Sequence, residues 1–490
     1  MKAQAVSVKT GNIYIGIDFG MALTKAAVKI AIPNSTEKNH FVIEFPRDAK
    51  ENDSAVHIPS SIWYSEDRIF GLQPPKNIGG PTSLFGKGME LFWGVSKPET
   101  PIKAIDRLKL LLIEDWKLDK DNAPHKRILD NFTARDLVTL KIAMVLAFAK
   151  HSTDKFIQVK ARGAQWNWHI QCAVPTLEGT TPQKACANIR LVLERAWELS
   201  KEIPNPEDGI TFESAKKFIA KSKNQPLQDE GKSVVHSYPE SLAAALFRLQ
   251  SDDVTPGLWM TIDIGGLTTD TAFFWFTPGI HSSEKIASYY TIQSIECGFD
   301  QLVQAKMGPA KSIGGIGHKE IAEIKDAGLS QADYFKSFEG TVNMAIGSTL
   351  AKTLKKMRAL TGLFDTTDGQ IQKPTFKVLL LGGGSTHPLL QAKLKEWRWT
   401  RVNKGPWDHS PPHDLVDTET STLPGHALVL RKDGTTHMLG NRNVFAREQA
   451  IVSLAYGLAQ PPWDMPSHDI EPDGKPYVFK EPAENPNKHT

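Results

Sequence analysis

Two runs of the sequence place an aspartate and glycines directly after an apolar stretch, a combination that can hold phosphate groups. The first run ends in Asp18 and Gly20, and the second ends in Asp263, Gly265 and Gly266. In each run a second apolar stretch follows, so we expect a strand, a tight turn and a second strand. Such a turn presents backbone N–H groups that can bind an anion, and its carboxylate can hold Mg²⁺ through coordinated water. Two facing turns of this kind predict a site that grips a polyphosphate from both sides.

A third apolar run, over 378–390, ends in Gly382, Gly383, Gly384 and Ser385. Because these glycines lack side chains, a flat nucleoside could lie close against the backbone there. Each run taken alone is equally typical of a β-hairpin whose glycines only serve positive-φ positions. The three runs together, in this order, favour a nucleotide site.

The elements that must position these turns indicate an α/β protein. Strand-like runs alternate with segments that are apolar at three- and four-residue spacing, which predicts helices over 134–150, 182–199, 239–249 and 342–360. A Pro- and Gly-containing break at 251–257 divides the chain nearly in half, and each half begins with a strand–turn–strand unit. We therefore expect two related lobes. A further hairpin is expected at 428–440.

Composition excludes several other classes of protein. The 490 residues are 40% apolar and 23% charged, with a net charge of +3 and three cysteines that show no CxxC spacing. A near-neutral charge argues against nucleic-acid or membrane-surface partners, and three such cysteines argue against a disulfide framework. No apolar run approaches the ~20 residues of a membrane helix, and no secretory signal is visible. We expect a cytoplasmic protein.

The motifs resemble those of the actin, sugar-kinase and heat-shock chaperone ATPase superfamily, and most of all the ATPase domain of DnaK-like chaperones. GIDFG at 16–20 is similar to the phosphate-1 motif, DIGGLTTD at 263–270 to the phosphate-2 motif, and LLLGGGSTHP at 379–388 to the adenosine motif. Weaker matches fall in the right order, including SYPESLAAAL at 237–246 and ECGFDQL at 296–302. The resemblance spans about residues 12–462.

This resemblance implies a two-lobed actin-like fold, with ribonuclease-H-like duplicated domains around a cleft for ATP or ADP with Mg²⁺. The implied boundaries are a tail at 1–11, lobe I at 12–255 with an insertion at about 40–160, lobe II at 256–462 with insertions at about 304–365 and 393–447, and a Pro-rich tail at 463–490. Asp18 and Asp263 would position the hydrated metal ion. Glu240 or Asp270 would orient the attacking water. The residues implied in nucleotide binding are Gly20, Thr24, Lys25, Gly265, Gly266, Thr268, Thr269, Gly298, Gly382, Gly383, Gly384 and Ser385.

The sequence departs from the chaperone pattern at several positions. Met21 and Ala22 replace two threonines, and Lys25 matches the spacing of the phosphate-contacting lysine of actins. The chaperones' catalytic lysine has no direct counterpart, and the sequence leaves open whether Lys103 or Lys109 replaces it. Tyr238 stands where a glutamate is expected before the proline, and Glu240 follows that proline instead. These departures leave the rate of hydrolysis open.

We expect no peptide-binding domain of the chaperone kind after the ATPase region. Only about 30 Pro-rich residues follow 459, so the resemblance implies a nucleotide-dependent switch that acts on an unidentified protein partner, with the segment 393–447 as a possible partner surface. The alternatives are a filament-forming actin homologue of the plasmid-segregation type and a small-molecule kinase on the same fold. A homo-oligomer is compatible with each of them.

Overall fold

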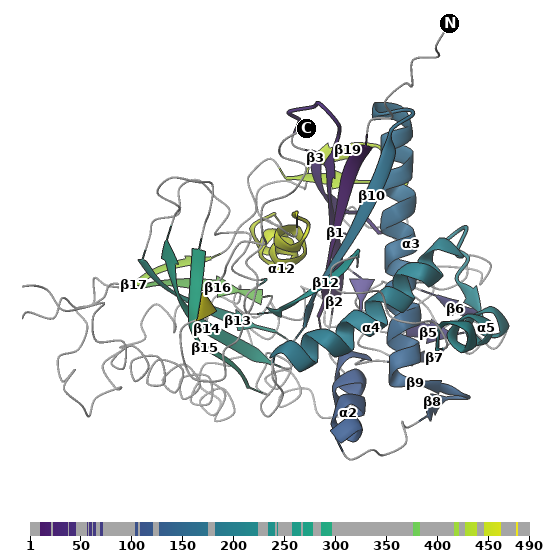
Figure 1. The fold of residues 1–490 in the computed structure, drawn as a ribbon, viewed down its shortest axis with the longest axis horizontal. Helices are drawn as coiled ribbons and strands as arrows, with labels where there is room; N and C mark the ends of the chain where they lie inside the picture. The colour runs from purple at the N-terminus through teal and green to yellow at the C-terminus, as the bar shows by residue number, and fades with distance from the viewer. Residues whose placement is uncertain are drawn as a thin grey trace, which may run out of the picture.

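The protein is a mixed α/β structure built on two main sheets (Figure 1). The computed structural model describes residues 10–20, 23–37, 39–45, 56, 58–60, 62–64, 69–71, 103–105, 108–120, 127–174, 182–223, 234–240, 243, 257–265, 268–277, 286–295, 376–382, 416–420, 427–438, 445–461 and 477–478. The expected α/β class is confirmed. Within the described part of the chain, no helix has the length and apolar character needed to span a bilayer.

The first sheet has eight strands, and the predicted hairpin with Asp18 lies at its centre. Strand β1 pairs antiparallel with β2 and parallel with β10. The strand order is β12-β10-β1-β2-β3-β18-β19, with β4 also paired to β2. The bounds are β1 Thr10–Phe19, β2 Leu23–Ala31, β3 Asn39–Ile43, β4 Ile58–Pro59, β10 Gln165–Val174, β12 Val235–Pro239, β18 Leu428–Leu430 and β19 Thr436–Met438.

Helices cover both faces of this sheet, because β1 is apolar on one face and has glycine at position 16 on the other. Ile13, Ile15 and Ile17 enter the main core, which α3 (Ala134–Lys160) and α4 (Pro182–Lys201) help to form. On the opposite face, α12 (Phe445–Leu458) packs on β1 and β2. A Cβ at Gly16 would overlap the carbonyl oxygen of Ala455, so glycine is what lets α12 approach this closely.

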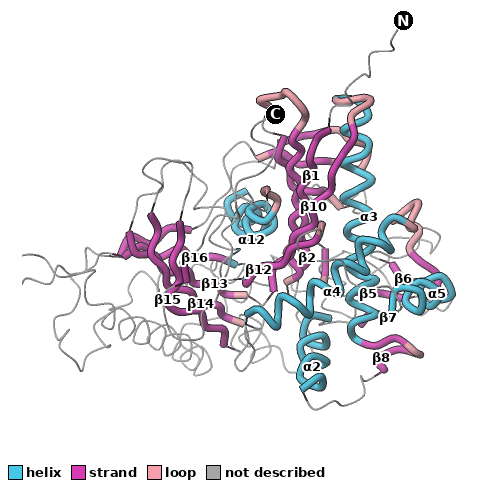
Figure 2. The backbone as a smooth tube through the Cα atoms, in the orientation of Figure 1, coloured by secondary structure: helices cyan, strands magenta, loops and turns pink. Residues whose placement is uncertain are grey.

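The second sheet repeats the plan of the first. An antiparallel hairpin, β13–β14, again has its first strand paired in parallel with a later strand, β16. The strand order is β17-β16-β13-β14-β15-β20. In Figure 2 the strands of the second sheet lie apart from those of the first, and α12 is seen end-on between the two sheets. The bounds are β13 Gly257–Ile264, β14 Thr269–Thr277, β15 Ile286–Ile295, β16 Phe376–Leu381, β17 Val416–Thr420 and β20 Tyr477–Val478.

A smaller unit packs beside the first sheet. It combines a four-stranded sheet, a two-stranded hairpin and two helices. Phe70, Phe132 and Phe212 form an aromatic cluster within it, and the rings of Phe70 and Phe212 are stacked with centroids 4.1 Å apart. The bounds are β5 Ile62–Tyr64, β6 Ile69–Gly71, β7 Lys103–Ile105, β8 Arg127–Leu129, β9 Phe132–Thr133, β11 Ile210–Thr211, α2 Leu108–Lys120 and α5 Phe212–Lys223.

Three C-terminal segments join sheets other than those that the domain boundaries expected from the sequence would suggest. The predicted hairpin at 428–440 is confirmed as β18–β19, but β18 pairs with β3 of the first sheet although the boundaries place it in lobe II. Helix α12 likewise packs on the first sheet. Within the tail at 463–490, β20 pairs with β15. The helices expected at 134–150 and 182–199 are confirmed as α3 and α4, while the segment 342–360 lies outside the described residues.

Candidate functional site

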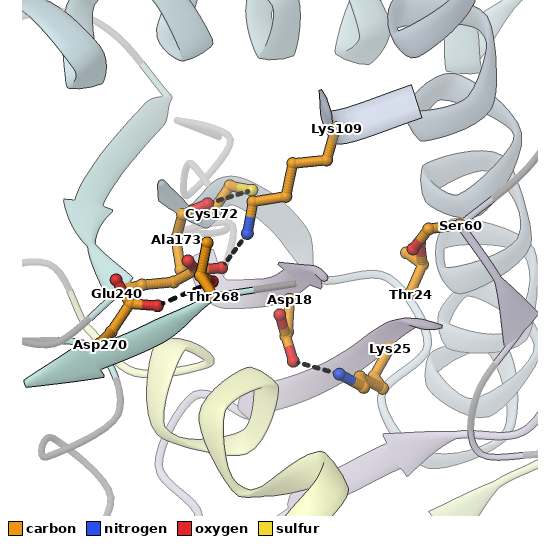
Figure 3. A network of polar contacts seen from close by, with 10 residues as sticks. All are labelled: Asp18, Thr24, Lys25, Ser60, Lys109, Cys172, Ala173, Glu240, Thr268 and Asp270. Atoms are coloured by element: carbon orange, nitrogen blue, oxygen red, sulfur yellow. Dashed lines mark hydrogen bonds and ion pairs between the residues drawn. The ribbon is translucent and has the colours of Figure 1, made fainter. Parts of the chain in front are cut away.

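The two hairpins predicted from the sequence bring their aspartates into one polar cluster. Figure 3 shows Asp18 from β1, Asp270 from β14 and Glu240 from the end of β12 around a common centre. In the same view, Lys109 of α2 extends to Glu240, and Lys25 of β2 extends to Asp18. Elements separated by more than two hundred residues in the chain therefore meet at this point.

The first hairpin forms an ion pair at its tip. Because Asp18 lies opposite Lys25 in the register of β1 and β2, their side chains share a face. Lys25 Nζ lies 2.6 Å from Asp18 Oδ2, and both side chains are largely buried. The turn closes through Gly20, whose N–H donates to the carbonyl oxygen of Leu23 at 3.1 Å. A Cβ at Gly20 would lie 2.6 Å from that oxygen, so the tight turn requires glycine.

A second ion pair joins Lys109 and Glu240, and both side chains are buried. Burial alone would lower the pKa of Lys109, but the carboxylates of Glu240, Asp18 and Asp270 together outweigh it, so this pKa is raised and the amine stays charged. Burial raises the pKa of Glu240 to about 7, although Lys109 opposes the shift. A carboxyl group with a pKa near neutrality can accept a proton at physiological pH.

The second hairpin brings two aspartates face to face. Asp263 and Asp270 are directly opposite in the register of β13 and β14, and Thr268 Oγ1 donates to Asp270 Oδ2 at 3.1 Å. Burial is the largest cause that raises the pKa of Asp263 well above its usual value, and the carboxylates of Asp270, Glu240 and Asp18 raise it further. Like charges opposite one another are unfavourable, so the raised pKa of Asp263 favours its protonated, neutral form next to Asp270.

Glycines allow the backbone to approach these aspartates. The N–H of Gly265 donates to the carbonyl oxygen of Thr268 at 2.9 Å, which closes the turn between β13 and β14. Gly382, at the end of β16, has φ +77. A Cβ there would overlap Asp263 Oδ1 and lie 2.7 Å from the carbonyl oxygen of Ile264. The third glycine run therefore begins directly against the second hairpin, as the nucleotide-site hypothesis expects.

The donor set fits a hydrated divalent cation. Asp18, Glu240, Asp263 and Asp270 supply four carboxyl groups, of which Asp18 is paired with Lys25 and Glu240 with Lys109. Among the described residues, no group of three or more His, Cys, Asp or Glu side chains is arranged to hold a metal ion directly. Mg²⁺ is commonly held by one or two carboxylates while it keeps several waters, and this arrangement suits that mode.

Two threonines of the expected set face away from the cluster. Thr24 is fully buried, and its hydroxyl lies 2.7 Å from Ser60 Oγ on the core side of the sheet (Figure 3). Thr269 alternates with Thr268 and Asp270 along β14 and is also fully buried. Neither side chain can reach a ligand at the cluster, because neighbouring residues of a strand point to opposite faces. The expected contacts of Gly266, Gly298, Gly383, Gly384 and Ser385 lie outside the described residues.

The structure distinguishes the two lysines that the sequence left open. Lys109 is the second residue of α2 and pairs with Glu240, whereas Lys103 belongs to β7, which pairs with β5 in the small sheet. A helix start at Leu108 is the sequence signal that could have favoured Lys109 over Lys103. It places Lys109 in the first turn of α2, from which its side chain pairs with Glu240. Cys172 of β10 lies beside the same ion pair (Figure 3), and burial raises the pKa of its thiol.

Comparison with known proteins assigns no relative. No protein-family model matches the chain, and no curated protein matches it either.

Proposed function

We propose that this chain is an ATP-binding protein with a two-lobed actin-like fold, and that it hydrolyses ATP as a DnaK-like ATPase domain does. The observation that carries the proposal is the convergence of Asp18, Lys109, Glu240 and Asp270 from four separate elements on one centre. A cluster with this charge, between two glycine turns, suits a triphosphate and its counter-ion.

The side chains divide the chemistry between them. Lys25 and Lys109 carry the positive charge that a triphosphate requires. Glu240, with its pKa near 7, would orient a water molecule for in-line attack on the γ-phosphorus and accept its proton. Asp18 and Asp263 would hold the hydrated Mg²⁺, which when bound neutralises phosphate charge. The N–H groups of the two turns would bind phosphate oxygens from both sides.

An Asp263→Ala variant tests the proposal. We expect it to lose Mg-ATP turnover while keeping the wild-type circular dichroism spectrum and unfolding midpoint. The fold should tolerate the change because Asp263 lies near the end of β13, and because burying its charged carboxylate costs free energy of folding. Asp154→Ala, which removes a carboxylate of α3 far from the cluster, is the matched control and should retain turnover. Unchanged turnover in Asp263→Ala would remove this residue from the site. Calorimetry that detects no heat with Mg-ATP or Mg-ADP would overturn the proposal as a whole.

We further propose that the bound nucleotide acts as a switch for a protein partner. Each main sheet contributes one hairpin to the cluster, so a ligand held by both hairpins couples the positions of the two sheets. The protein should then bind its partner in one nucleotide state only. Purification from the native cell in the presence of ATP or of ADP tests this, and a partner set that is identical in the two states would contradict it.

The ion pair between Lys25 and Asp18 favours a second candidate, a filament-forming actin homologue. A lysine at this spacing is similar to that of actins, and here it reaches the first carboxylate of the site. Sedimentation with ATP and with ADP separates the candidates, since a filament former pellets in a nucleotide-dependent manner and a switch protein stays in the supernatant.

A further inference from the structure

Helix α2 is attached to α3 by a buried ion pair at some distance from the cluster. Arg135 Nε lies 2.9 Å from Asp115 Oδ2, and the Asp115 side chain is only 3% exposed. Asp115 belongs to α2, the helix that also carries Lys109. We propose that Asp115 and Arg135 are positioning residues that set the rotation of α2 and thereby aim Lys109 at Glu240. This inference rests on the proposed function of the cluster.

The two ion pairs hold α2 at different points. Asp115 lies six residues after Lys109, which places it ~9 Å farther along the helix axis and ~120° around it. Lys109 pairs with the end of β12, and Asp115 pairs with the start of α3. Two ionic contacts at different heights and angles restrain both the rotation and the axial position of a helix.

The apolar contacts of α2 do not provide the same restraint. Leu108, Leu112, Ile113 and Trp116 are buried in the main core, but hydrophobic attraction is non-directional and tolerates small rotations. A rotation of ~10° moves a side-chain end ~6 Å from the axis by ~1 Å. Displacements of this size at a reacting group can reduce a rate by about 100-fold. The ion pair therefore carries the precision that the apolar face lacks.

Arg135 is itself held in place. It lies in the first turn of α3, where Thr133 and Asp136 form a capping box. The carboxylate of Asp136 accepts hydrogen bonds from the backbone N–H and the hydroxyl of Thr133, and Lys223 lies 3.6 Å from it. Arg195 of α4 lies near enough to Asp136 and Arg135 for both charges to act on its pKa, which burial lowers. The start of α3, which carries Arg135, is therefore held by contacts that do not involve α2.

The experiment compares Arg135→Met, Arg135→Lys and Asp115→Asn with Arg190→Met as the matched control. Arg190 makes an ion pair of similar length and burial with Glu194, but within α4. The first readout is kcat and KM for ATP. The second readout needs no activity: competitive labelling of amines with a small acylating reagent, followed by mass spectrometry. Lys109 and Lys141 are both buried, at 4% and 1% exposure, so Lys141 reports general loosening of the same lobe.

In Arg135→Met we expect kcat to fall ~10- to 100-fold with little change in KM, and Lys109 labelling to rise several-fold while Lys141 labelling stays at the wild-type level. Arg135→Lys should restore most of kcat and most of the protection of Lys109 from labelling. Asp115→Asn should behave like Arg135→Met, and Arg190→Met should behave like wild type. The inference is overturned if Lys109 labelling is unchanged in Arg135→Met, or if Lys109 and Lys141 labelling rise together. A wild-type protein without ATPase activity contradicts the proposed function instead, and the labelling result then still decides whether the ion pair positions Lys109.

Discussion

Lys141 in the middle of α3 should cost the protein stability at neutral pH, and its replacement by methionine should recover it. The side chain is fully buried, and burial lowers its pKa from 10.5 to about 7. Each unit of such a shift corresponds to about 1.4 kcal/mol of differential interaction between the two protonation states. The buried amine therefore costs about 4 kcal/mol at pH 7 relative to a neutral side chain of similar length.

The sign of the pH dependence follows from the direction of the shift. Between pH 7 and 10.5 the unfolded chain binds the proton of Lys141 more strongly than the folded chain does, so stability rises as the pH rises through this window. Methionine removes the titration and preserves the shape, since it is unbranched and flexible. The advantage of Lys141→Met over wild type should shrink from about 4 kcal/mol at pH 7 to about 2 kcal/mol at pH 9.

Urea unfolding of both proteins at pH 7, 8 and 9 measures this difference. Lys150→Met serves as control, because Lys150 lies on the same helix, is about one-third exposed and pairs with Asp154 at 2.5 Å. It should change stability by less than about 1 kcal/mol at every pH. A Lys141→Met protein that is no more stable than wild type, or whose advantage is the same at all three pH values, would refute the burial argument.

Two further predictions concern the face of the first sheet that α12 covers. Gly16→Ala should lower the free energy of unfolding by about 1–3 kcal/mol, because the added Cβ would lie 2.5 Å from the backbone nitrogen of Ala459. Chemical denaturation measures this change, and an unchanged midpoint would contradict the prediction. His169 and His236 have pKa values lowered by burial to about 4, so stability should fall as the pH falls from 6.5 to 4, by at most about 3 kcal/mol for each. The double variant His169→Phe, His236→Phe should flatten this slope in acid titrations followed by circular dichroism, and an unaltered slope would assign it to other groups.

Much of the candidate site could be predicted from local sequence because its chemistry is carried by turns. A carboxylate at the end of an apolar run, followed by glycine, specifies a strand and a tight turn whichever protein surrounds it. Asp18 and Asp263 were placed at such turns, and each lies at the tip of its hairpin. The α/β class and the starts of α3 and α4 followed from apolar periodicity in the same way, whereas α3 continues ten residues beyond the predicted end at 150.

Other features of the site could not be predicted, because they depend on which face of a strand meets which partner. Thr24 and Thr269 carry hydroxyl groups next to the expected phosphate contacts, yet strand alternation turns both toward the core. The choice between Lys103 and Lys109 depended on the placement of α2 against β12, which are joined by a contact between residues 131 positions apart. No local pattern encodes such a distance.

By itself, the sequence determined the secondary structure around each motif, the repeated hairpin design and the residue types that a phosphate site needs, since these depend on backbone geometry over a few neighbouring residues. Only the tertiary structure decided that Lys109 completes the cluster, that β18–β19 and α12 join the first sheet, and that Lys25 neutralises Asp18. The physical reason is that burial and charge act through space, so the pKa values of Glu240 and Asp263 exist only once distant segments have packed together.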